Sequence, residues 1–99
     1  MKMDLRAAAV SIRITCMAEA ISRSHGISWN DASFLIDLAG VEDHRGHDIR
    51  DLDVDGREWI LWLAHRGLVE LEDSMGILYF RISPKGRRVV LDARHELDA

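Results

Sequence analysis

The stretch 57–92 constrains the fold most, because it predicts a helix, a β-hairpin and a second helix in close succession. The first helix ends at Gly67, a residue that readily takes the left-handed conformation that closes a helix. A turn over 73–76 separates two short apolar runs. Ser83 followed by Pro84 is a typical helix start. The chain is therefore expected to fold as an α+β domain that is mostly helical.

The two runs, 68–73 and 77–83, have the period-2 alternation of strands that are buried on one face. They predict a two-stranded hairpin. One set of apolar side chains is expected to point inward: Val69, Leu71, Leu78, Phe80 and Ile82.

The N-terminal segment 4–24 contains no Gly or Pro and predicts one long helix. It carries two apolar faces, the first with Leu5, Ala9, Ile12, Cys16 and Ala20, the second with Val10, Ile14, Met17 and Ile21. A helix this apolar needs contacts on more than one side, and in a small domain the second side is often a twin subunit. We therefore expect a homodimer, with Cys16 in the core.

Three further helices are predicted. Ser28 caps a helix that ends at Gly40, with Asp31 completing a variant capping box. Asp55 is expected to cap a helix over 56–66, with Glu58 as its third residue. The last helix, 84–97, places Val89, Val90, Ala93 and Leu97 on one stripe. Between the first two of these lies the acidic loop 42–55, with six acidic and two basic residues and room for one short helical turn at 47–52.

At 99 residues the chain has room for one domain with one modest core. We divide it into a long N-terminal helix (4–24), a helical core (28–67), a hairpin (68–83) and a C-terminal helix (84–97). No apolar run suits a secretory signal or a membrane span, and the single cysteine fits a reducing cytosol, so we expect a cytoplasmic protein.

The segments Leu63–Val69 and Tyr79–Arg87 resemble the second half of winged helix-turn-helix regulators of the MarR-like kind. The resemblance covers the C-terminal half. It implies a two-stranded wing, a dimerisation helix at 4–24, and a tri-helical core whose first helices fall in 29–52. The N-terminal half departs from the pattern, because its middle helix is short and acidic.

This resemblance implies a transcriptional regulator whose helix 56–66 reads duplex DNA in the major groove. On that helix Trp59, Ile60, Leu63 and Ala64 form the expected buried arc. Residues implied in DNA binding, or in partner binding, are Arg57, Glu58, Leu61, Trp62, His65, Arg66, Arg81, Lys85, Arg87 and Arg88. Trp62 has two readings: it contacts a partner, or it packs under the acidic loop or against the N-terminal helix.

The charge of the chain opposes DNA binding. Its net charge is −4, and the predicted wing carries acids where a DNA-contacting wing offers Arg or Lys. The bases of 81–94 could contact phosphate, pair with the acidic loop or form a solvated face. The alternative is a winged-helix protein-interaction module, such as a phage-type inhibitor, whose acidic, DNA-mimicking surface meets a basic protein through Asp48, Asp51, Asp53, Glu70, Glu72 and Asp73.

Other chemistry finds little support. The run 51–56 matches the opening of a calcium loop, but Trp62 stands where the bidentate Glu is required. His44 and His47 would need further ligands to hold zinc. No nucleophile elbow, phosphate-binding glycine loop or catalytic triad is present. We expect no enzyme activity, metal or cofactor.

Overall fold

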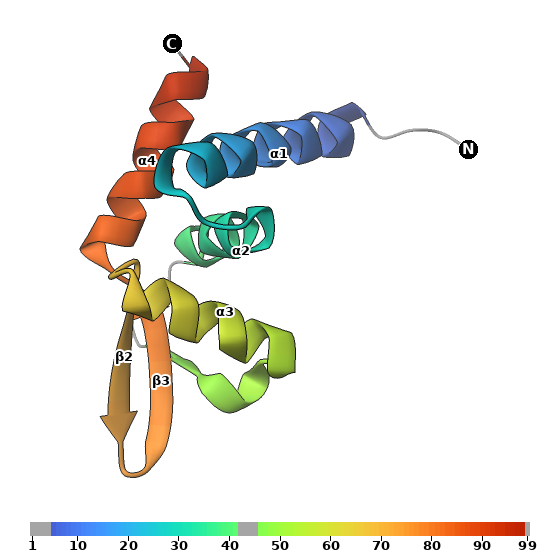
Figure 1. Ribbon diagram of the computed structural model, residues 1–99. Coiled ribbons are helices and arrows are strands. Elements are labelled where there is room, and N and C mark those ends of the chain that lie inside the picture. Colours follow the sequence, from blue (N-terminus) through green and yellow to red (C-terminus); the bar gives the residue numbers. More distant parts are fainter. Residues whose placement is uncertain (1–4, 42–45, 99) are drawn as a thin grey trace.

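The computed structural model describes residues 5–41 and 46–98, with side chains from residue 12 onward (Figure 1). Within those ranges the elements are α1 (Leu5–His25), α2 (Trp29–Ala39), β1 (His47–Asp48), the 3₁₀ turn η1 (Ile49–Asp51), α3 (Val54–His65), β2 (Val69–Ser74), β3 (Ile77–Ile82) and α4 (Pro84–Asp98). The strands form an antiparallel sheet in the order β1-β3-β2. The predicted α+β, mostly helical fold with a hairpin wing is confirmed.

The helices α1, α2 and α4 pack together at one end, and the sheet and α3 lie at the other (Figure 1). One apolar core joins the two parts. Phe34 on α2 makes the link, since its ring lies 6.0 Å from that of Trp59 on α3 and 6.4 Å from that of Phe80 on β3. The fully buried large side chains are Ile21, Leu35, Ile60 and Leu63, one or two from each of the first three helices.

The predicted helix boundaries at Ser28 and Gly67 are confirmed. Gly26 follows α1 with a φ of +65°. The Ser28 hydroxyl accepts the backbone N–H of Asp31 at 3.0 Å and caps α2. Gly67 has a φ of +76° and donates to the carbonyl of Ala64 at 3.0 Å, which closes α3 in the left-handed manner.

The predicted start of α3 was wrong by two residues. The cap is Asp53, whose Oδ1 accepts the backbone N–H of Gly56 at 2.7 Å. Because the turn η1 ends at Asp51 and Leu52 is extended, Asp53 is the residue that stands at the helix entrance. Asp55 lies inside the first turn, where its negative charge interacts favourably with the positive end of the helix dipole.

The hairpin has the predicted turn, with Val69 opposite Ile82 and Ser74 opposite Ile77. Met75 and Gly76 both have positive φ, as a two-residue hairpin turn requires. Inward burial is confirmed for Val69, Phe80 and Ile82.

Leu71 was wrongly predicted to be buried: it is 37% exposed, because β2 is an edge strand and the wing extends past the core. Leu78 is half-buried. The strand β1, which pairs His47 with Phe80, was not predicted.

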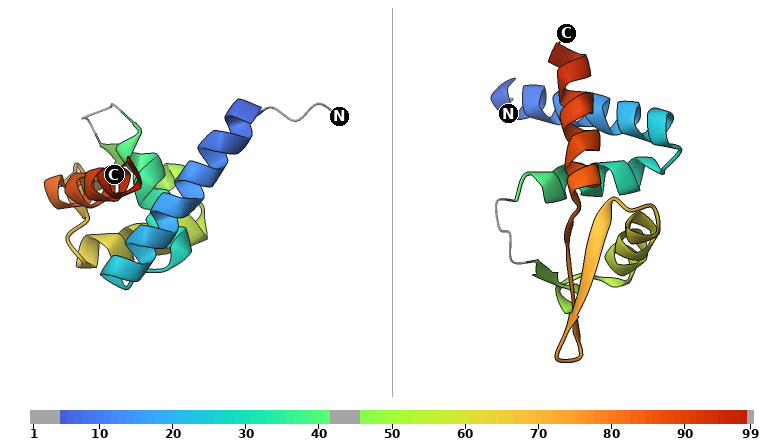
Figure 2. Two further views of the ribbon diagram at one scale, coloured as in Figure 1. Left: turned by 90° about the horizontal axis from the view of Figure 1, so that it is seen from above. Right: turned by 90° about the vertical axis from the view of Figure 1, so that its left-hand side faces the viewer.

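The N-terminal half of α1 extends beyond the other helices (Figure 2). Met17, Ala18 and Ile21 are buried in the core, whereas Ile12 is 65% exposed. The prediction that Cys16 is a core residue was wrong, because it lies on the exposed face of α1. Of the four residues predicted to share one stripe of α4, Val89, Val90 and Ala93 are buried, whereas Leu97 is 39% exposed.

Hydrogen bonds of Ser83 connect the end of α3 to the start of α4. Its hydroxyl donates to the carbonyl of Gly67 at 2.6 Å and accepts the N–H of Gly86 at 3.0 Å, which confirms its predicted role as a helix cap. Its backbone N–H donates to the carbonyl of Leu68 at 3.1 Å. Gly86 is buried against this junction, and a Cβ there would overlap the carbonyl oxygen of Leu68 and lie 2.8 Å from Ile82 Cγ1.

We predict that Gly86→Ala lowers the free energy of unfolding by about 2–3 kcal/mol, because the added methyl must push α4 away from Leu68 and the end of β3. Urea unfolding followed by circular dichroism measures this. Gly40→Ala is the matched control: its φ is −78° and its Cβ would meet ordinary contacts, so the change should stay within about 1 kcal/mol. Equal losses in the two variants would contradict the packing described for Gly86.

Candidate nucleic-acid interface

The outer face of α3 is the surface that the resemblance assigns to DNA. Gly56, Ile60 and Leu63 are buried, and Trp59 and Ala64 are half-buried, so the predicted buried arc is correct. The exposed arc presents Arg57, Glu58, Leu61, Trp62 and His65.

The element directly before α3 is the three-residue 3₁₀ turn η1. A single 3₁₀ turn covers less of α3 than a full helix would. On the exposed arc, Leu61 is 52% and Trp62 48% exposed.

Trp62 lies beside the side chains of His65 and Arg66. The His65 ring stacks on it with centroids 6.2 Å apart, and the guanidinium carbon of Arg66 lies 5.1 Å from the centre of the Trp62 ring. Of the two readings of Trp62, the half-exposed ring favours the one in which it faces a partner. The contact with the Trp62 ring restrains the Arg66 guanidinium, which reduces the entropy that this side chain loses when it binds an anion.

Three bases gather where α3 ends and α4 begins. Arg66 Nη1 donates to the carbonyl of His25 at 3.1 Å, and Lys85 Nζ donates to the carbonyl of Arg66 at 3.2 Å. Arg88 is exposed and lies one turn after Lys85 on the same side of α4. We call Arg66, Lys85 and Arg88 the basic cluster. Neutral carbonyls fix two of these side chains without cancelling their charge, so the cluster stays attractive to an anion.

The remaining predicted bases lie elsewhere. Arg57 is at the opposite end of α3, where its Nε donates to the carbonyl of Leu52 at 3.1 Å. Arg81 is neutralised by Glu70 across the hairpin, at 2.9 Å.

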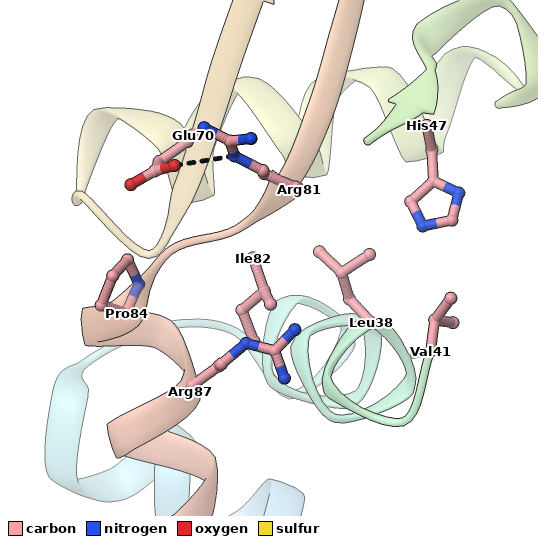
Figure 3. A pocket seen from close by; sticks show the side chains of 8 residues that line it. All are labelled: Leu38, Val41, His47, Glu70, Arg81, Ile82, Pro84 and Arg87. Carbon is pink, nitrogen blue, oxygen red and sulfur yellow. Dashed lines mark hydrogen bonds and ion pairs between the residues drawn. The ribbon is translucent and has the colours of Figure 1, made fainter. Parts of the chain in front are cut away.

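Arg87 is half-buried and points into a cavity of about 300 Å³ between α2, the sheet and α4 (Figure 3). The cavity has an apolar side made by Leu38, Val41 and Ile82. The structure therefore does not bring Arg81 and Arg87 into the basic cluster.

Most of the acids predicted for a partner surface are engaged within the chain. Asp48 binds Arg50 at 2.7 Å, and the hydrogen bonds from the side chain and backbone of Arg50 hold the pKa of Asp48 below its ordinary value. Asp53 caps α3, and Asp73 Oδ1 accepts the N–H of Gly76 in the hairpin turn at 3.1 Å.

With Glu70 paired to Arg81, Asp51 and Glu72 are the two predicted acids that make no hydrogen bond or ion pair among the described residues. The acidic loop residues Glu42 and Asp43, with His44 and Arg45, fall outside the described residues. Within the ranges that are described, no three His, Cys, Asp or Glu side chains form a group that could hold a metal ion. None of the helices described is long and apolar enough to span a membrane.

Sequence reasoning found the members of the basic cluster but not their grouping. Arg66 was predicted on the helix 56–66, and Lys85 and Arg88 were predicted among the bases of 81–94. The carbonyl of His25 that holds Arg66 gave no signal in the sequence, since the hydrogen bond spans 41 residues and uses backbone. The spacing of Trp62, His65 and Arg66, three and four apart, was the available sign of stacking.

Comparison with known proteins gives a match at the level of the fold. No protein-family model and no curated protein sequence matches the chain. Among solved structures, it is similar to a MarR-family transcriptional regulator from Rhodococcus sp. RHA1, with a TM-score of 0.59 and 21% sequence identity over 92% of this chain and 70% of that one. The protein SSV1 F-93 is similar at a TM-score of 0.44 and 16% identity, over 65% of this chain and 83% of that one. The helices, the hairpin wing and the first of these similarities together establish a winged-helix fold.

Proposed function

We propose that this protein is a winged-helix regulator that binds duplex DNA through α3 and the basic cluster, and that it acts in the cytoplasm without catalysing a reaction. One observation carries the proposal: the charges of Arg66, Lys85 and Arg88 meet neutral carbonyls or solvent, and no carboxylate pairs with them in the described part of the chain. Uncompensated bases beside the reading helix are what phosphate binding requires.

In the proposed complex α3 lies in the major groove. Its 12 residues extend about 18 Å, so Arg57 at one end and the basic cluster at the other can contact separate phosphates. Between them Glu58 and His65 offer polar atoms to base edges, and Leu61 and Trp62 offer apolar contact to thymine methyl groups. The acidic wing tip stays away from the backbone, because Glu72 and Asp73 would be repelled by phosphates.

A single small reading surface gives weak binding, which a second copy would strengthen. We propose that two chains associate through the exposed face of α1. Ile12 and Cys16 lie one helical turn apart on that face, which is turned away from the core that Ile14 and Met17 contact. The ion pair of Arg13 with Asp98, at 2.6 Å, holds the end of α4 beside α1, so that Leu97 can extend the apolar surface.

A second candidate function is binding of a protein through α3. It is favoured by Leu61 and Trp62, which place two large apolar side chains side by side at about half exposure. Aromatic side chains of this kind often anchor protein interfaces. Failure of the protein to bind duplex DNA at low salt would leave this candidate as the better account of α3.

For the first candidate we predict that Arg88→Ala weakens binding to a fluorescein-labelled duplex of about 30 base pairs by about three- to tenfold. Anisotropy titrations at salt concentrations from about 50 to 200 mM measure the affinity and its salt dependence. Loss of one phosphate contact should also reduce the slope of log K against log salt by about one.

Arg94→Ala is the matched control, because it removes the same charge from the same helix at an exposed position six residues further on. Its affinity should equal that of the unchanged protein. Two results would refute the proposal: absence of binding at the lowest salt, or equal losses in Arg88→Ala and Arg94→Ala, which would indicate attraction by overall charge alone.

The proposed dimer predicts that Ile12→Glu gives a monomer that keeps its helical circular dichroism spectrum, because Ile12 makes few contacts within one chain. Light scattering coupled to gel filtration measures the mass. Ser24→Glu adds the same charge at an exposed position of α1 outside this face and should remain dimeric. A monomeric mass for the unchanged protein at micromolar concentration would show that α1 does not serve this role.

A further inference from the structure

The edge of the wing offers a surface that DNA binding does not use. The strand order β1-β3-β2 leaves one side of β2 without a neighbouring strand among the described residues. In Figure 1 this is the left-hand side of β2, where no helix lies against the lower part of the wing. A free strand edge carries unpaired backbone N–H and carbonyl groups that can bind another extended chain.

The side chains along this edge alternate in character. Glu70 and Glu72 point to the outer face of the sheet, opposite Arg81 and Tyr79. Leu71 points to the inner face and is 37% exposed. A groove of about 270 Å³ lies on the sheet at these residues. The pattern therefore presents carboxylates on one face and an apolar side chain on the other.

Glu72 carries an unpaired charge on this surface. Glu70 is paired with Arg81 at 2.9 Å, whereas Glu72 makes no hydrogen bond or ion pair within the described residues and has Tyr79 as its cross-strand neighbour. Directly opposite residues on adjacent strands lie about 4.5–5.5 Å apart at Cβ, so a lysine or arginine on an added strand would reach this carboxylate.

The same charges exclude a second copy as the occupant. Pairing two β2 edges would set the acids of 70–73 against one another, and like charges on adjacent strands are destabilising. A basic strand would have the opposite effect on Glu72. It would also cover Leu71 if its alternate residues were apolar.

We propose that the free edge of β2 binds an extended segment of a partner protein in which lysine or arginine alternates with apolar residues, by adding it to the sheet as a fourth strand. The basic residues pair with Glu72 and approach Glu70, and the apolar residues cover Leu71. This partner site is separate from α3 and goes beyond the proposed DNA binding.

The test is a titration of the ¹⁵N-labelled full chain with a capped peptide that alternates lysine and valine. The backbone amide signals of β2 should shift, and their hydrogen exchange should slow. Glu72→Gln should weaken binding by about three- to tenfold, as expected for one lost charge pair at a surface. Glu96→Gln, an exposed change on α4, is the matched control and should bind as the unchanged protein does.

A second peptide separates strand addition from simple charge attraction. It keeps every lysine but replaces valine with proline, which has no N–H to donate to β2. The proposal requires that this peptide bind much more weakly. Equal binding of the two peptides, absence of binding, or shifts outside the wing would each overturn it. The titration contains no DNA, so its outcome is independent of the test of α3.

Discussion

The junction at Ser83 is the constraint on which the geometry of the proposed DNA-binding surface depends. Its hydroxyl joins the carbonyl of Gly67 to the N–H of Gly86, and its backbone N–H binds Leu68. The end of α3, the base of the wing and the start of α4 are therefore fixed to one another. This fixes the basic cluster too, since Lys85 reaches the carbonyl of Arg66 across the same junction. The tight packing at Gly86 gives the junction one arrangement, because a larger residue has no room there.

The distribution of charge explains how an acidic chain can present a basic surface. Two acids are neutralised by neighbouring arginines, Glu70 by Arg81 and Asp48 by Arg50. Asp53 and Asp73 keep their charge, but they accept backbone N–H groups at the start of α3 and in the hairpin turn, away from the basic cluster. The bases at the end of α3 are instead held by carbonyls, which leaves their charge available. The net charge of the whole chain is therefore a poor guide to its partner, and the local pairing of each group decides the field at α3.

Much of the fold could be predicted from the sequence because its signals are local. The caps at Ser28 and Ser83 and the glycine after α3 act over three or four residues, and the alternation of the hairpin over five. Errors arose where two equivalent residues competed, as Asp53 and Asp55 did for one cap, or where burial depended on distant elements. Cys16 and Leu71 fit an apolar pattern, but within the described ranges both are exposed. The residues of the candidate site could be listed from the sequence. The tertiary fold was needed to show that Arg81 is paired with Glu70, that Arg87 lines a cavity, and that the basic cluster is separate from both.

In the proposed complex, DNA lies against α3 and not against the wing tip. Thiol alkylation tests it directly in a Cys16→Ser background, with one cysteine introduced as Leu61→Cys on α3 or as Met75→Cys at the tip, where Met75 is 99% exposed. Saturating duplex DNA should slow alkylation strongly at position 61 and leave position 75 unchanged. Protection at position 75, or none at position 61, would contradict the account.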